Sequence, residues 1–337
     1  MTFRTRLTLL ASCAVLLITT IGLPAAELKA AGATFPAPLY NKWIESFQAR
    51  NPAVHIRYEA TGSEAGIQML RDGKLDFAAS DLPPADGQEF WHLPTVAGAV
   101  VPAYNLPGFT GDLRLSPQAL AGIFLGKITK WNDPQIRQSN RGVKLPASSI
   151  VVVHRSDGSG TTFVLSDYLS KVSAEWRAIM GRGSTLKWWG GEAAEGNEGV
   201  ASKVAHTANS IGYVEFIYSV EQRLASAAVQ NAAGHFVQAD IPSVTAAAAS
   251  ATNMPDDFGV SITNAPGDQA YPIASFTWFL VPAHSTDSHK RQELCDFLSW
   301  ALSSGEKTAA ALGYVALPPD LIARELAMIQ GTSFSRR

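Results

Sequence analysis

The sequence has little cysteine, and its charges nearly balance. Two cysteines among 337 residues can build neither a disulfide-rich scaffold nor a zinc site with four cysteine ligands. With 27 Lys and Arg against 29 Asp and Glu, the net charge of −2 argues against a nucleic-acid-binding surface, which normally carries a basic stripe. The seven histidines lack metal-ligand spacing, and neither a Gly-x-Ser-x-Gly elbow nor a phosphate-binding P-loop occurs. We therefore expect no metal, no cofactor and no nucleic acid, and an enzyme is the weaker alternative.

The N-terminus is typical of a secretory signal. Arg4 and Arg6 precede an apolar, uncharged stretch that ends in small residues, which predicts a cleaved signal peptide over residues 1–26 and an exported protein. One alternative is a membrane anchor, because the stretch nears the roughly 20 residues that a spanning helix needs. Another is lipid anchoring through Cys13, which ends a lipobox-like segment. Cleavage after residue 26 would leave a net charge of −4 and Cys295 as the single cysteine.

Repeated strand–turn–helix units predict an α/β protein with covered sheets. Two long extended runs, at residues 96–104 and 271–281, are candidate crossovers between two lobes; the alternative is that both are ordinary central strands. With two crossovers, the first lobe would be discontinuous (residues 27–100 and 271–337), and the second would comprise residues 101–270. The predicted strands are 29–31, 54–58, 75–79, 150–154 and 211–214, and the predicted helices begin near residues 36, 63, 117, 134, 161, 241, 293 and 319.

Three turns rich in hydrogen-bond donors each follow a predicted strand and open a predicted helix, at residues 32–36, 61–63 and 157–161. A helix begins with unpaired N–H groups and a partial positive charge, so such a turn can bind an anion. Each turn alone is typical of an ordinary cap. The three together, with Arg155 just before the third, favour an anion site. Asp157 could brace the guanidinium group or cap the helix.

Asp81 follows a predicted buried strand, at the sheet edge where ligands bind in open α/β proteins. An ionised carboxylate only accepts hydrogen bonds, so it repels a fully deprotonated anion. Two unit charges about 4 Å apart at an effective dielectric constant of 20 interact by roughly 4 kcal/mol. A ligand that keeps a proton turns this repulsion into a hydrogen bond, so Asp81 would admit hydrogen phosphate and exclude sulfate. The alternative is that Asp81 caps the turn before Pro83.

These segments resemble the periplasmic phosphate-binding proteins of high-affinity phosphate ABC transporters. The family's initial Gly-Ala-Gly-Ala-Thr-Phe-Pro-Ala-Pro differs from residues 30–38 only at Ala30. Further similar segments follow in order along the chain, at residues 77–81, 125–131, 155–161 and 211–215.

The resemblance implies a two-lobed, type II periplasmic-binding fold that closes on one phosphate. In the family the anion is held by the residues that match Thr34, Phe35 (through its backbone N–H), Ser63, Asp81, Arg155, Ser159, Gly160 and Thr161. The match to Asp157 orients the arginine. The implied role is that of a periplasmic, monomeric receptor that passes phosphate to membrane permease subunits. Alternatives are a phosphate sensor or surface protein without a transport role, a binder of arsenate, and a phosphohydrolase.

Glu64 departs from the family pattern, which usually has small residues after the serine. The simpler interpretation is a first-turn glutamate that is favoured by the helix dipole and points to solvent. The other is that Glu64 borders the cleft and weakens anion affinity or demands a more protonated ligand.

Overall fold

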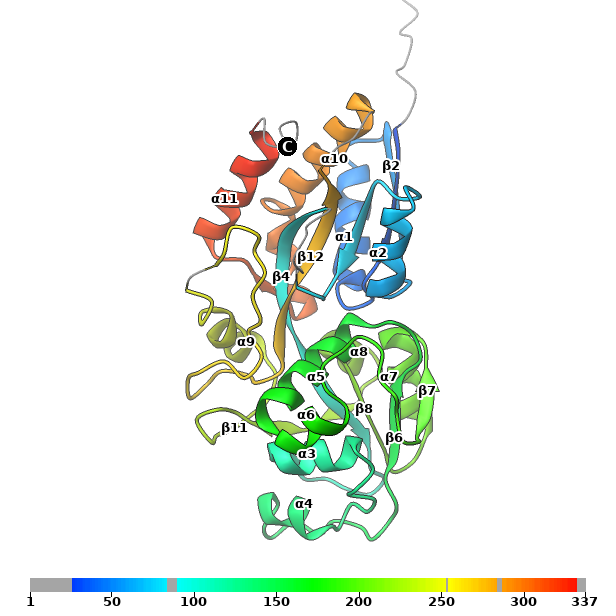
Figure 1. Cartoon of the computed structure of the whole chain (residues 1–337), viewed down its shortest axis with the longest axis vertical. Helices are drawn as coiled ribbons and strands as arrows, with labels where there is room; N and C mark the ends of the chain where they lie inside the picture. Colours follow the sequence, from blue (N-terminus) through cyan, green and yellow to red (C-terminus); the bar gives the residue numbers. More distant parts are fainter. Residues whose placement is uncertain (1–25, 84–89, 253, 284–286, 332–337) are drawn as a thin grey trace, which may run out of the picture.

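The computed structural model describes residues 26–83, 90–252, 254–283 and 287–331. Cys13 and nearly all of the predicted signal peptide lie outside the described residues. Figure 1 shows two lobes, one above the other, with strands β4 and β12 running between them. Within the described ranges, no helix combines the length and the hydropathy that a membrane span requires.

A single mixed sheet passes through both lobes. Its ten described strands follow the order β2-β1-β3-β12-β4-β8-β6-β7, and β9 and β13 also pair with β4. Their bounds are β1 (Ala26–Gly32), β2 (Val54–Glu59), β3 (Phe77–Ser80), β4 (Phe90–Asn105), β6 (Val151–Arg155), β7 (Glu192–Ala194), β8 (Ser210–Glu215), β9 (Ala225–Ser226), β12 (Ala274–Pro282) and β13 (Val315–Ala316). A small second sheet contains β5 (Arg114–Leu115), β10 (Ala228–Gln230) and β11 (Phe236–Val237).

Strand β4 is shared by the lobes. Its first part pairs with β12 as far as Ala99, and its second part pairs with β8 from Val100 onward. The returning chain is fixed at the same point, since the Val100 N–H donates to the Ile273 carbonyl at 2.9 Å and the Tyr271 hydroxyl donates to the Val100 carbonyl at 3.0 Å. The two predicted crossovers are therefore present, and the hinge lies where β4 exchanges partners. The numerical lobe boundaries stay a prediction.

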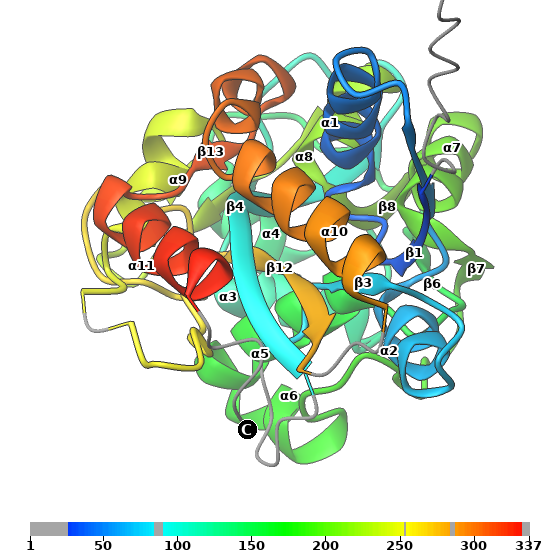
Figure 2. The same ribbon diagram turned by 90° about the horizontal axis from the view of Figure 1, so that it is seen from above.

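The helices cover the sheet in both lobes. They are α1 (Ala37–Gln48), α2 (Ser63–Arg71), α3 (Pro117–Phe124), α4 (Pro134–Ser139), α5 (Gly160–Val172), α6 (Ala174–Ile179), α7 (Gly196–His206), α8 (Phe216–Glu221), α9 (Ile241–Ala248), α10 (Ser288–Ala301) and α11 (Pro319–Gln330), with short 3₁₀ helices at Gly305–Thr308 and Ala310–Leu312. Seen from above, α10 lies across the upper part of the sheet, beside α1 (Figure 2). Helix α2 packs instead on β1 and β3.

Aromatic side chains fill the core of the upper lobe. Tyr40 and Trp43 of α1 are buried and stack at 5.5 Å between ring centroids. Tyr40 also meets Phe279 of β12 at 4.4 Å, so α1 is packed onto the shared sheet. In α2, Leu70 is buried, whereas Ile67 and Met69 are half-buried.

The carboxyl ends of the parallel strands point at the space between the lobes. Strands β1 and β3 end there from the upper lobe, and β6, β7 and β8 end there from the lower lobe. Strand β7 and the start of α7 both lie within residues 190–199. Side chains that follow these strands therefore meet at the interface between the lobes.

Candidate functional site

The upper lobe contributes hydroxyl groups and one acid. Ser63 begins α2, and its Oγ accepts a hydrogen bond from the backbone N–H of Asp81 at 3.3 Å. The Asp81 Oδ1 accepts from the Thr277 hydroxyl at 2.7 Å. Asp81 is only 1% exposed, so its carboxyl is fixed in position and removed from water.

Burial sets the protonation of Asp81. Removal from water raises the pKa of this carboxyl to about 7, although the Thr277 hydrogen bond and the charge of Arg155 act in the opposite direction. The carboxyl can therefore gain or lose a proton near neutral pH, and its charge responds to what lies beside it.

The lower lobe contributes a braced guanidinium group. Arg155 is 3% exposed and ends β6. Its Nε donates to Asp157 Oδ1 at 2.7 Å, its Nη2 pairs with Asp157 Oδ2, and its Nη1 donates to the Thr161 hydroxyl at 3.3 Å. Burial alone would raise the pKa of Asp157, but Arg155 and the Gly196 N–H hold that pKa below its ordinary value. Asp157 thus stays charged and orients the arginine.

Helix α5 starts beside this arginine. Ser159 is its N-cap, because the Ser159 Oγ accepts from the Thr162 N–H at 3.1 Å, so the alternative prediction that Asp157 caps this helix is wrong. The accepting hydroxyl of Ser159 keeps its own hydrogen for donation. Gly160 and Thr161 are the first two residues of α5, so their N–H groups have no carbonyl one turn earlier in the helix.

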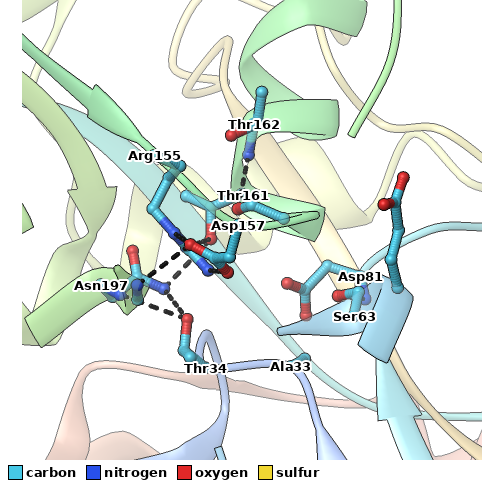
Figure 3. Close-up of polar contacts among 12 residues, drawn as sticks. Ala33, Thr34, Ser63, Asp81, Arg155, Asp157, Thr161, Thr162 and Asn197 are labelled. Carbon is cyan, nitrogen blue, oxygen red and sulfur yellow. Dashed lines mark hydrogen bonds and ion pairs between the residues drawn. The ribbon is translucent and has the colours of Figure 1, made fainter. Parts of the chain in front are cut away.

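The two sets of groups meet at Gly160. A Cβ atom built on Gly160 would lie 2.5 Å from Asp81 Oδ2 and 2.6 Å from Ser63 Oγ, so only glycine fits. Figure 3 shows the Asp81 carboxyl facing the Arg155, Asp157 and Thr161 side chains across the interface. The acid of one lobe therefore adjoins the donor-rich helix start of the other.

Asn197, which the sequence analysis missed, joins the lobes on the other side of the site. Its Nδ2 donates to the Thr34 hydroxyl at 2.8 Å and to the Thr161 hydroxyl at 3.1 Å, and its Oδ1 accepts from the Glu215 N–H at 2.9 Å. It is fully buried (Figure 3). The sequence does contain a related pattern, since Gly196 opens a helix one residue after the end of a strand, much as in the three predicted donor-rich turns.

Phe35 and His154 are each held in place by contacts of their aromatic rings. The ring of Phe35 is buried against Gly98 at the hinge, and its carbonyl accepts from the Tyr314 hydroxyl at 2.7 Å, so only the Phe35 N–H is available to the site. His154 stacks on Trp188 at 5.0 Å between ring centroids, and its Nδ1 lies 3.1 Å from the carbonyl oxygen of Arg155, so its ring meets the backbone of that residue rather than the guanidinium group.

Comparison with known proteins places the chain in a family. A family model described as a PBP superfamily domain matches residues 19–305. The phosphate-binding protein PstS of Xylella fastidiosa strain Temecula1 is 43% identical over 303 residues, which cover 88% of this chain and 83% of that protein. The chain belongs to the PstS family of phosphate-binding proteins. The PstS protein of Pasteurella multocida is 42% identical, with 88% of each chain covered, and these names describe binding proteins rather than enzymes.

Solved structures of similar proteins share the two-lobed periplasmic-binding fold. A phosphate-binding protein from Stenotrophomonas maltophilia has a TM-score of 0.71 and 20% identity, with 92% of this chain and 95% of that chain covered. A putative phosphate ABC transporter substrate-binding protein from Clostridium perfringens, solved with bound phosphate, has a TM-score of 0.64 and 19% identity, with 87% of this chain and 100% of that chain covered. The predicted fold class is therefore confirmed.

Proposed function

We propose that this PstS-family chain captures inorganic phosphate between its lobes and delivers it to the permease of an ABC transporter. The supporting observation is the placement of Asp81 against the start of α5, with Arg155 beside it. The Asp81 carboxylate can only accept hydrogen bonds once it is ionised, whereas the guanidinium group of Arg155 and the first N–H groups of α5 can only donate. A tetrahedral anion that still carries a proton satisfies both.

In this proposal many weak donors combine to hold the anion. Desolvating an isolated charge costs on the order of tens of kcal/mol, whereas one charge-assisted hydrogen bond returns roughly 1.5–3 kcal/mol net. The donors would be the guanidinium group of Arg155, three backbone N–H groups and four hydroxyls, namely the N–H groups of Phe35, Gly160 and Thr161 and the side chains of Thr34, Ser63, Ser159 and Thr161. Asp81 would accept the hydrogen that phosphate retains.

The test is calorimetry of the chain without residues 1–26, titrated with phosphate, arsenate and sulfate at pH 8. Phosphate and arsenate should bind, because both keep a proton at this pH, and sulfate should not. Absence of phosphate binding across neutral pH would contradict the proposal. Sulfate binding as tight as phosphate binding would contradict the role of Asp81.

We further propose that the chain is exported with loss of its signal peptide and acts as a monomer. Restored phosphate uptake in a strain that lacks its own phosphate-binding protein would separate a transport receptor from a sensor. Sedimentation would report the oligomeric state. A phosphatase assay, with Arg155→Ala as control, tests the proposal that the chain is not an enzyme, and turnover that this substitution abolishes would overturn it.

A further inference from the structure

Glu64 reaches from the upper lobe to the lower one. It lies in the first turn of α2, and its backbone N–H donates to the Gly158 carbonyl at 3.1 Å. Its carboxylate accepts hydrogen bonds from the Ser184 hydroxyl, through Oε1, and from the Thr185 hydroxyl at 3.3 Å, through Oε2. A Cβ atom on Gly158 would overlap the same carboxylate, so the two lobes are in direct contact here.

The segment that contains Ser184 and Thr185 is hydrogen-bonded to the proposed anion site. The Ser184 carbonyl accepts a hydrogen bond from the backbone N–H of Ser159 at 3.0 Å. Ser159 is the N-cap of α5, the helix whose first residue, Gly160, adjoins Asp81. Ser184 is therefore connected to the start of α5 through one backbone hydrogen bond, and a displacement of Ser184 would also shift this end of the helix.

We propose that Glu64, Ser184 and Thr185 form a clasp that holds the lobes together and slows the release of the bound anion. This inference rests on the proposed function. Because the partners belong to different lobes, the clasp bonds exist only while the lobes are in contact, and they favour the closed form by the difference between these bonds and the bonds to water that replace them in the open form. Hydrogen bonds to an ionised carboxylate are about twice as strong as neutral ones.

The clasp changes the interpretation of Glu64. The expectation that its carboxylate only points to solvent is wrong, because the exposed side chain is hydrogen-bonded to the other lobe. The second expectation, that it borders the cleft, agrees with these contacts. Its effect on affinity would be the opposite of that expected for repulsion, since these hydrogen bonds stabilise the closed form, whereas solvent and salt screen the repulsion between an exposed charge and the anion.

Stopped-flow release of phosphate from Glu64→Ala, Ser184→Ala and the double variant tests the clasp. Release should be about tenfold faster in each single variant, which is the loss expected for a charge-assisted hydrogen bond. The double variant should release no faster than Glu64→Ala, because both changes remove the same bond. The association rate should rise by less than the release rate, since the clasp closes only part of the ligand-free population. Glu64→Gln, which keeps an acceptor oxygen, should lie between wild type and Glu64→Ala.

Glu45→Ala is the matched control. Glu45 is an exposed helical glutamate of the same lobe, and its partner, Lys42, lies on its own helix at 2.8 Å. Release from this variant should equal that from wild type, and the melting temperatures of all ligand-free variants should agree. Unchanged release from Glu64→Ala, or tighter binding through faster association, would overturn the clasp.

Small-angle scattering of the ligand-free chain separates this proposal from the proposed function. A clasp predicts a larger radius of gyration for Glu64→Ala than for wild type and Glu45→Ala. If wild type bound no phosphate but this difference appeared, the proposed function would fail and the clasp would stand. Equal radii in a protein that binds no phosphate would reject both.

Discussion

The two lobes bring different chemistry to their interface. The lower lobe presents a positive charge and a helix start, and both are held by bonds within that lobe: Arg155 to Asp157 and Thr161, and α5 to its Ser159 cap. The upper lobe presents Asp81, which depends on Thr277 and whose pKa lies at about 7. In the proposed function, the lower lobe would attract a small oxoanion through donors that are already in place, whereas the upper lobe would respond to protons. Attraction and selection would then lie on different lobes.

The largest effect on phosphate binding should come from Arg155 of the lower lobe. Arg155→Ala should weaken phosphate binding about a thousandfold or more, because the anion loses its guanidinium partner and Asp157 is left as a half-buried carboxylate without its countercharge. Calorimetry at pH 8 measures the loss. Arg155 is proposed to lie in the site, so normal binding by this variant would rule out the site as assigned.

The controls for Arg155→Ala must separate the loss of the positive charge from a loss of folding. Arg155→Lys keeps the positive charge but loses the two parallel bonds to Asp157, so it should fall between wild type and Arg155→Ala. Arg182→Ala removes a cation of the same lobe that pairs with Asp167 at 3.2 Å, and it should bind phosphate normally.

The second effect concerns selection. Asp81→Asn should strengthen sulfate binding about a hundredfold at pH 8.5, because a neutral amide that can donate replaces a repelling carboxylate. At pH 6 the gain should shrink, since a carboxyl with a pKa of about 7 is then mostly protonated and can itself donate to sulfate. Sulfate titrations of both proteins at the two pH values provide the test. A gain that does not depend on pH would show that Asp81 selects by shape rather than by charge.

The contributions of Asp81 and Asp157 to the free energy of unfolding should depend on pH in opposite directions. Burial raises the pKa of Asp81 above its unfolded value of 3.8, so its stabilising contribution is complete at acid pH and is lost as the pH rises from about 4 to about 7. The pKa of Asp157 is lowered, so its contribution is present at neutral pH and is lost as the pH falls through the folded value.

Denaturant unfolding of the ligand-free chain at pH 5 and pH 8 measures this difference. Between these values wild type should lose about 2 kcal/mol more than Asp81→Asn, an order-of-magnitude figure that follows from linkage. Glu306, whose pKa burial raises to about 8, titrates in both proteins, so its contribution cancels in the comparison. Parallel pH profiles for the two proteins would contradict the raised pKa of Asp81.

Sequence patterns predicted the fold and one part of the site, because the residues that mark these features are close together in the chain. Strand ends, glycines and capping residues lie within a few positions of one another, so the helix starts at Ser63 and Gly160 can be read from short segments. The exchange of partners along β4 was visible as an unusually long extended run.

What the sequence did not reveal depends on partners that are distant in the chain. Asn197 meets Thr34 across 163 positions, and Glu64 meets Ser184 across 120. No local spacing reports such pairs, because each joins residues that lie far apart in the sequence and on different lobes. The same limit applies to Asp81, whose pKa follows from burial that only the folded chain shows.

The smallest effect should come from Asn197, which bonds to both lobes without being a proposed contact of the anion. Asn197→Ala should weaken phosphate binding about tenfold, because the hydroxyls of Thr34 and Thr161 lose the donor that fixes their orientation. Asn140→Ala is the matched control, since Asn140 is a buried amide of the lower lobe that bonds only locally, to Arg114 and Ile136. Both variants should lose stability in denaturant, but calorimetry should find weaker phosphate binding in Asn197→Ala alone. Equal affinities would mean that the two lobes position their hydroxyls independently, and the connection through Asn197 would then be a matter of packing.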